Sequence, residues 1–245
     1  MKNSILFGCL LFVSTLFSQN MEIGILAGGS FYNGDIDVTA GTALQQMRPA
    51  GGIFFRYHPQ TWLALRGMIS AGTLYADEKR FPTSEWRPRR GFDFSSPIVE
   101  LAFMPEIRPF SIGNVAFYGF VGIAGAYFNP RTNFNDPASS EYWSTPNIDA
   151  DKAQQTSHIT VAIPLGAGFQ WFMTENIALG GELGVRKTFS DYFDGISQIA
   201  GFRSKDYYYF GGITLSLFFG NGQRGGGGMW QTGGKRGGGV SCYKF

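Results

Sequence analysis

The sequence is poor in charge for its length. Only 16% of its 245 residues are Asp, Glu, Lys or Arg, whereas an ordinary soluble domain carries roughly 25%. The formal net charge is +2, and the basic residues are scattered along the chain. A nucleic-acid-binding protein concentrates positive charge on one surface, so the sequence argues against a nucleic-acid partner.

Long apolar segments are missing past residue 20. No uninterrupted stretch there approaches the roughly 20 residues that a membrane helix needs. In hydrocarbon only helices and closed barrels satisfy every backbone polar group, so a membrane-inserted form of this chain has to be a closed sheet. What the chain does contain, 35 Gly and 16% aromatic residues, suits strands with one face toward lipid and one toward a crowded interior.

The N-terminal segment has the features of a signal peptide. Lys2 is followed by an apolar run over residues 5–17, which is typical of an export signal and short for a spanning helix. We predict a signal peptide over residues 1–18, with cleavage after Ser18. A lipoprotein signal ending at Cys9 is the alternative, although Cys9 comes before most of the apolar run.

Alternating segments separated by turn residues cover the middle of the chain. Each is long enough for a tilted membrane strand, and we predict strands at 21–30, 48–57, 62–75, 97–110, 115–128, 158–173, 177–189 and 207–219. The connections are alternately short (58–61, 111–114 and 174–176) and long (31–47, 76–96, 129–157 and 190–206). This pattern is typical of outer-membrane proteins whose short turns face the periplasm.

These segments predict an all-β fold for residues 19–219, a transmembrane antiparallel up-and-down β-barrel of about eight strands. The long connections have room for one more hairpin, which leaves the strand number open by two. An even number of strands places both termini in the periplasm and the barrel in the cell outer membrane, with outer-membrane lipids around it.

Four acids and four bases fall on the predicted inward faces. The interior of an eight-strand barrel is barely wide enough for side chains, so a balanced set is expected to pair and fill it, and Arg binds carboxylates through two points. A transport path is the alternative. The predicted lumen ion-pair network consists of Glu22, Arg56, Arg66, Glu100, Glu106, Arg108, Glu182 and Arg186.

Residues 220–245 differ from the rest. They are dominated by Gly, contain Lys and Arg without any acid, and are expected to form a flexible periplasmic tail. The tail ends in Cys242, Tyr243, Lys244 and Phe245. After signal removal Cys242 is the single cysteine, and an odd cysteine suggests pairing between chains. We predict that these four residues dock a partner; a tail without a role is the alternative.

The sequence offers little for catalysis. His58 is predicted to lie in a short turn, and Ser157 and His158 are adjacent, which in a strand places them on opposite faces. Cys and His residues do not cluster as transition-metal ligands do. We therefore predict a protein that is not an enzyme, with no catalytic residues, cofactor or metal. A small channel or a lipid-modifying enzyme is the less favoured alternative.

Several stretches resemble the PorG-like barrel proteins of Bacteroidota. They include Gly28-Gly29-Ser30-Phe31-Tyr32-Asn33-Gly34-Asp35, Val99-Glu100-Leu101, Ile163-Pro164-Leu165-Gly166 and Ser190-Asp191-Tyr192-Phe193-Asp194-Gly195-Ile196-Ser197. The last is similar to that family's Asp-Tyr-Leu-Asp-Asp-Val-Ser element. The similarity runs from about residue 21 to 219 and returns at Cys242, with Gly195 and Tyr243 departing from the pattern.

The resemblance implies a non-enzymatic subunit of the type IX protein secretion system. Its expected partners are a periplasmic ring lipoprotein and that lipoprotein's partner subunit, which the barrel anchors or docks. A free-standing barrel similar to OmpA, which stabilises the envelope or serves adhesion, is the alternative. The first role predicts cargo trapped in the periplasm when the gene is lost, whereas the second predicts leakage while secretion continues.

Overall fold

The structure is a computed structural model that describes residues 20–33, 44–77, 93–133, 149, 153, 158–189, 207–219 and 230–232. The predicted signal peptide at 1–18 lies outside the described residues. So does the predicted tail apart from residues 230–232, and with it the four predicted docking residues.

One sheet contains every described strand. Its elements are β1 (Met21–Asn33), β2 (Arg48–Gln60), β3 (Leu63–Asp77), β4 (Asp93–Ile112), β5 (Val115–Val121), β6 (Ile123–Phe128), β7 (Arg131–Thr132), β8 (His158–Phe172), β9 (Ile177–Thr188), β10 (Tyr207–Phe219) and β11 (Trp230–Thr232). A short 3-10 helix, η1 (Leu44–Gln46), precedes β2.

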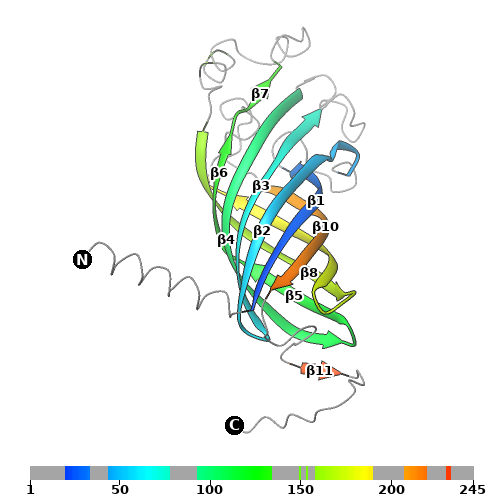
Figure 1. Cartoon of the computed structure of the whole chain (residues 1–245). Helices are drawn as coiled ribbons and strands as arrows, with labels where there is room; N and C mark the ends of the chain where they lie inside the picture. Colours follow the sequence, from blue (N-terminus) through cyan, green and yellow to red (C-terminus); the bar gives the residue numbers. More distant parts are fainter. Residues whose placement is uncertain are drawn as a thin grey trace, which may run out of the picture.

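The sheet closes into a barrel (Figure 1). Neighbouring strands of the ring pair antiparallel, and β1 pairs with both β2 and β10. The segments β5, β6 and β7 all pair with β4, and β5 and β6 also pair with β8. They therefore occupy one position in the ring. The predicted antiparallel up-and-down barrel of about eight strands is confirmed.

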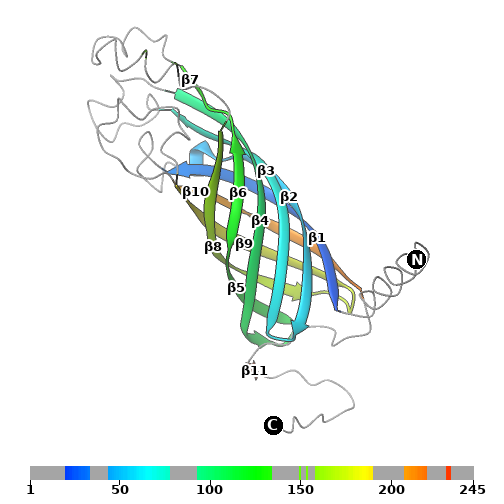
Figure 2. The same ribbon diagram turned by 90° about the vertical axis from the view of Figure 1, so that its left-hand side faces the viewer.

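The two ends of the barrel differ in their connections. At one end, here called the turn end, β2 joins β3, β4 joins β5 and β8 joins β9 through tight turns (Figures 1 and 2). At the opposite loop end, β4 begins beside the end of β3, where Asp93 lies opposite Asp77. The turn over 113–114 uses Gly113 with a φ of 58°, a conformation that favours glycine.

Several predicted boundaries were wrong. The predicted turn at 58–61 is shorter, because β2 continues to Gln60, and the predicted turn at 111–114 is shorter because β4 continues to Ile112. The predicted strand 115–128 is interrupted at Gly122, whose N–H donates to the carbonyl of Pro164. A strand ends where its pairing with a neighbouring strand ends. The alternation of apolar and polar residues along one segment does not show that point.

Two irregularities in the ladder coincide with prolines. The pairing of β2 with β3 shifts between Tyr57 and Gln60, where Pro59 lies. The pairing of β4 with β5 shifts between Ile107 and Phe110, where Pro109 lies. Proline has no N–H to contribute to a ladder. Each shift in register therefore places the proline where no hydrogen bond from its nitrogen is required.

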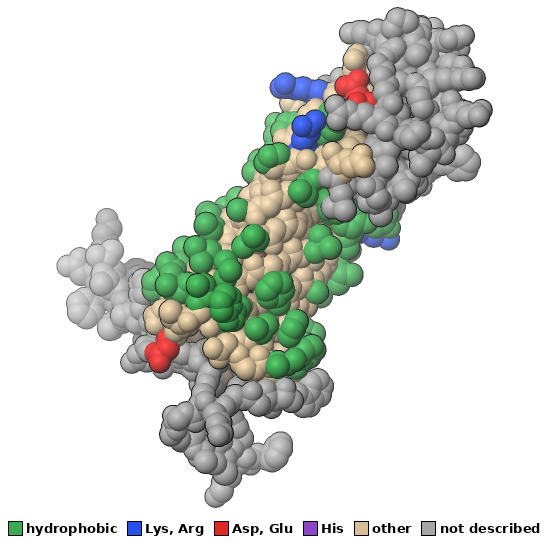
Figure 3. Space-filling model, turned by 90° about the vertical axis from the view of Figure 1, so that its right-hand side faces the viewer, with side chains coloured by type: hydrophobic (Ala, Val, Ile, Leu, Met, Phe, Trp, Pro, Cys, Tyr) green, Lys and Arg blue, Asp and Glu red, His purple; other side chains and the backbone are tan. Residues whose placement is uncertain are grey.

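The strands alternate between a buried inward face and an outward apolar face. In Figure 3 hydrophobic side chains are spread over the wall, and the charged side chains visible lie toward the barrel ends. Outward residues with exposed side chains include Ile23, Ile25, Ile53, Ile69, Leu101, Ile123, Val161, Leu183, Ile213 and Leu215. Soluble proteins rarely expose apolar patches of this extent, and a wall of this kind matches a lipid-facing surface.

Within the described part of the chain, no helix has the length and apolar character that a membrane crossing requires.

Candidate functional site: the filled lumen

The eight predicted lumen residues all point into the barrel and are at most 7% exposed. They come from five strands: Glu22 from β1, Arg56 from β2, Arg66 from β3, Glu100, Glu106 and Arg108 from β4, and Glu182 and Arg186 from β9. The structure brings them together in two separate groups. Six form the turn-end network, and the other two form the Glu100–Arg186 pair nearer the loop end.

Glu22 is one centre of the turn-end network. Arg56 lies directly opposite it on β2, and the Arg56 Nη1 donates to Glu22 Oε1 over 2.6 Å. The second oxygen, Oε2, lies 2.9 Å from the Nε2 of His58 and 3.6 Å from the Nη2 of Arg108. Both carboxylate oxygens therefore have cationic or polar partners.

Glu106 and Glu182 bridge two arginines that face each other. Arg56 and Arg66 are direct cross-strand neighbours, an arrangement that is destabilising for like charges alone. Glu106 lies 2.9 Å from the Nε of Arg56 and 2.7 Å from the Nε of Arg66. Glu182 lies 2.5 Å from the Nη1 of Arg66. The three carboxylates and three guanidinium groups of the network balance in charge.

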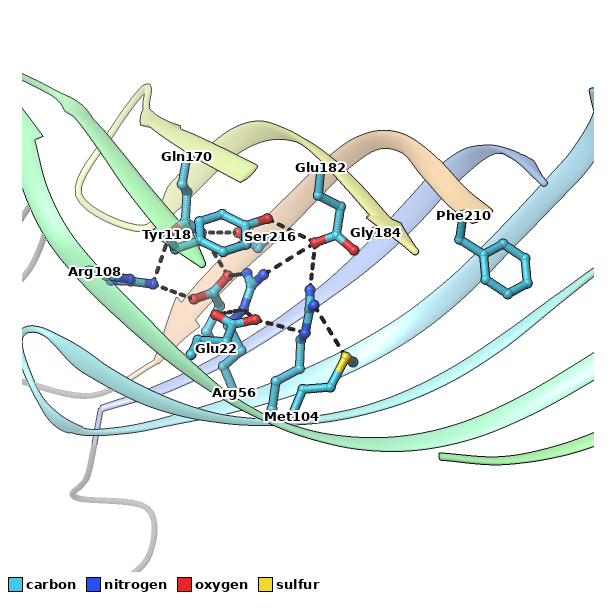
Figure 4. Close-up of polar contacts among 12 residues, drawn as sticks. Glu22, Arg56, Met104, Arg108, Tyr118, Gln170, Glu182, Gly184, Phe210 and Ser216 are labelled. Carbon is cyan, nitrogen blue, oxygen red and sulfur yellow. Dashed lines mark hydrogen bonds and ion pairs between the residues drawn. The ribbon is translucent and has the colours of Figure 1, made fainter. Parts of the chain in front are cut away.

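Neutral side chains complete the turn-end network, as Figure 4 shows. The Tyr118 hydroxyl of β5 donates to Glu182 over 2.8 Å. Gln170 of β8 donates to Glu22 over 2.7 Å and to the Ser216 hydroxyl of β10 over 3.0 Å, and its carbonyl accepts from Arg108 over 2.9 Å. Every position of the ring thus contributes a polar group.

The Glu100–Arg186 pair is simpler. The Arg186 Nε lies 3.5 Å from Glu100, and the Tyr208 hydroxyl donates to the other Glu100 oxygen over 2.5 Å. The Arg186 Nη1 donates to the carbonyl of Gly184 over 2.8 Å, and its guanidinium lies 4.9 Å from the centre of the Phe210 ring. One acid and one base balance here in a largely aromatic surrounding.

Five of these polar participants were not among the eight predicted residues. His58 was predicted to lie in a turn, which is wrong: it is the inward residue of β2 two positions after Arg56, and it is buried. Strand period alone would have placed it on the Arg56 face. Tyr118, Gln170, Tyr208 and Ser216 also lie on inward faces, but the prediction was built from charged residues alone.

Glycines make room for the large side chains. A Cβ on Gly168 would lie 2.6 Å from the Tyr118 ring and hydroxyl, and a Cβ on Gly184 would lie 2.7 Å from the Arg186 Nη1. Real Cβ atoms essentially never lie this close to another heavy atom, so a larger residue would displace the Tyr118 or Arg186 side chain or, at Gly168, the backbone of Gly181. The absence of a side chain at these positions is therefore part of the lumen packing.

The described polar side chains of the lumen are engaged with one another. Among the described residues, no three or more His, Cys, Asp and Glu side chains are grouped as a metal site requires. The buried carboxylates are engaged by guanidinium, imidazole, amide or hydroxyl groups. An arrangement of this kind fills the barrel and ties its strands together.

A family model matches this chain over most of its length. The model described as "Domain of unknown function (DUF6089)" matches residues 2–224, which includes every strand of the barrel ring. The chain belongs to the DUF6089 family. None of the curated proteins matches it in sequence.

Solved outer-membrane proteins are similar to this DUF6089 member at low identity. Ail of Yersinia pestis, solved with the heparin analogue sucrose octasulfate, is 13% identical, with 82% of this chain and 98% of that chain covered and a TM-score of 0.43. A major outer membrane protein from Thermus thermophilus is 13% identical, with 82% and 99% covered and a TM-score of 0.47.

Proposed function

We propose that this DUF6089 protein is a non-enzymatic outer-membrane subunit of the type IX protein secretion system, which anchors or docks the periplasmic ring. The observation that carries the proposal is the filled lumen. A pore lined by charges of one sign would favour ion passage, whereas this lumen is occupied by groups that neutralise one another. A barrel filled in this way is suited to be an anchor.

The outer wall supports the membrane location. Apolar side chains cover the strands on the outward face, and lipid is the solvent that such a face requires. With the turn end in the periplasm, as the length of the connections indicates, the last strand of the ring also ends there, because β10 runs from Tyr207 beside β9 to Phe219 beside Met21. The residues that follow are then available to periplasmic partners.

The ring is the proposed partner because of the PorG-like stretches and the composition of the tail. A Gly-rich linker attached to an anchored barrel holds the residues at its end at high effective concentration near the membrane. The proposed contact residues are Cys242, Tyr243, Lys244 and Phe245. The periplasm is oxidising, so Cys242 is proposed to pair with a cysteine of the ring lipoprotein or its partner subunit.

The test compares secretion in three strains. One lacks the gene, one carries the full chain, and one carries the chain without residues 233–245. We expect type IX cargo to accumulate in the periplasm of the first and third strains, and the ring lipoprotein to co-purify in mild detergent only with the full chain. A chain with residues 233–245 in scrambled order is the control for tail length and composition.

The competing role has a distinct outcome. If cargo is still secreted when the gene is lost, while the cells leak periplasmic proteins and become sensitive to detergent, the barrel supports the envelope and the secretion role is wrong. Non-reducing and reducing gels of the purified complex separately test the disulfide. A Cys242→Ser chain is expected to lose the cross-linked band.

A further inference from the structure

The last residues of β4 extend beyond their neighbour on one side. β3 begins at Leu63 opposite Ile107, and the N–H of Arg108 donates to the carbonyl of Trp62. The pairing of β4 with β3 therefore ends before residues 110–112. On one side these residues pair with β5, where Phe110 lies opposite Phe117 and Ile112 opposite Val115. Their other edge, at the turn end of the barrel, extends past β3.

That edge pairs with a segment from the C-terminal part of the chain. β11 pairs with β4 with Trp230 beside Phe110, Gln231 beside Ser111 and Thr232 beside Ile112. This is the one parallel pairing among the described strands. Both ribbon views place β11 at the turn end, where β4 meets β5 (Figures 1 and 2).

The sequence around β11 suits a short docking strand. Residues 229–232 are Met-Trp-Gln-Thr, with Gly225 to Gly228 before them and Gly233 and Gly234 after them. Tryptophan and threonine favour strands, whereas glycine disfavours them. The segment able to extend a sheet is therefore bounded by residues that do not extend it.

The pairing fixes the direction of β11. β4 runs from the loop end to the turn end, so a parallel strand on its edge runs the same way, away from the barrel. An antiparallel strand would run back toward the wall. In the ring order β1, β2, β3, β4, then β5 with β6, β8, β9 and β10, β10 and β4 are four positions apart, on opposite sides of the barrel.

We propose that the edge of β4 at residues 110–112 is a docking site for one extended strand, and that its occupant is the chain's own β11. This pairing, here called the latch, fixes where the C-terminal residues leave the barrel. An open edge presents unpaired N–H and C=O groups that readily accept another strand. Residues 220–229 reach about 33–36 Å when extended, so they can join opposite sides of a small barrel. The latch is independent of the ring partner.

A cross-linking experiment tests the position of β11. Ile112→Cys and Thr232→Cys are combined in a Cys242→Ser background, and the full chain is purified in detergent and oxidised. Residues in register on neighbouring strands are within disulfide range, so we expect a 112–232 disulfide in mass spectra of the digested protein. The control combines Phe219→Cys, at the end of β10, with Thr232→Cys. We expect at least tenfold less disulfide there, and equal yields would overturn the proposal.

Amide hydrogen exchange tests the docking without new cysteines. Gln231→Pro combined with Thr232→Pro removes two consecutive N–H groups. One of the two N–H groups faces β4, so the double variant loses it in either case. We expect at least tenfold faster exchange at one or more of residues 110–112, with no change in β9. The matched control, Gln231→Ala with Thr232→Ala, keeps both N–H groups and the protection. Unchanged exchange in the proline variant would overturn the latch, and neither result depends on the secretion role.

Discussion

The lumen holds charge in two ways. In the turn-end network, Glu22, Glu106 and Glu182 each lie within ion-pair distance of two arginines. In the Glu100–Arg186 pair, one carboxylate has one described cation, at 3.5 Å, and depends on hydroxyl groups for its other contacts. The network shares its charge among strands, whereas the pair concentrates it. Loss of a partner should therefore be tolerated better in the network.

The largest expected effect comes from removing a guanidinium group from each region. Arg186→Met leaves Glu100 without a described cation and is expected to lower the free energy of unfolding by about 3–5 kcal/mol, the range for a broken buried pair. Arg66→Met is expected to cost less, because Glu106 and Glu182 still contact Arg56. Urea unfolding in lipid vesicles, followed by tryptophan fluorescence, measures both.

Lys187→Met is the matched control, because Lys187 follows Arg186 on the exposed face of β9. We expect it to change the free energy of unfolding by at most about 0.5 kcal/mol, as surface changes usually do. If Arg66→Met were as costly as Arg186→Met or costlier, the distinction between shared and concentrated charge would fail.

A smaller effect is expected from removing a single hydroxyl group. Tyr208→Phe deletes the hydrogen bond to Glu100, and Tyr118→Phe deletes the one to Glu182. A hydrogen bond to a charged group contributes about 1.5–3 kcal/mol. We expect Tyr208→Phe near the upper value and Tyr118→Phe near the lower, because Glu182 retains Arg66. The same urea unfolding assay measures both variants. A larger loss of stability for Tyr118→Phe than for Tyr208→Phe would contradict the distinction between the network and the pair.

The smallest effect is expected from adding one methyl group in the lumen. Gly184→Ala places a Cβ against the Arg186 Nη1 and the Phe120 ring, and overpacking of this kind typically costs about 1–3 kcal/mol. We expect the low end, because both contacts are with the ends of side chains, which can shift. Gly125→Ala is the control, since a Cβ there meets nothing within 4 Å. Equal stability of the two variants in the unfolding assay would show that the lumen is not tightly packed at Gly184.

Alternation was sufficient to predict most of the barrel. The strands and their inward faces follow from a two-residue period, and the short and long connections follow from turn residues. Strand ends were predicted less well, because β4 and β2 continue through residues that resemble turns, with Pro59 and Pro109 accommodated by shifts in register. The parallel strand β11 left no periodic signal, since three residues are too few to show one.

Sequence alone determined which Glu and Arg side chains face the lumen and that their charges balance. Only the tertiary structure decided which acid meets which base, that Arg56 faces Arg66 across a strand pair, and that His58, Tyr118 and Gln170 join them. The physical reason is that alternation is a local property of each strand. Contacts across a lumen depend on the register of all the strands and on closure of the ring, which brings Glu182 of β9 against Arg66 of β3.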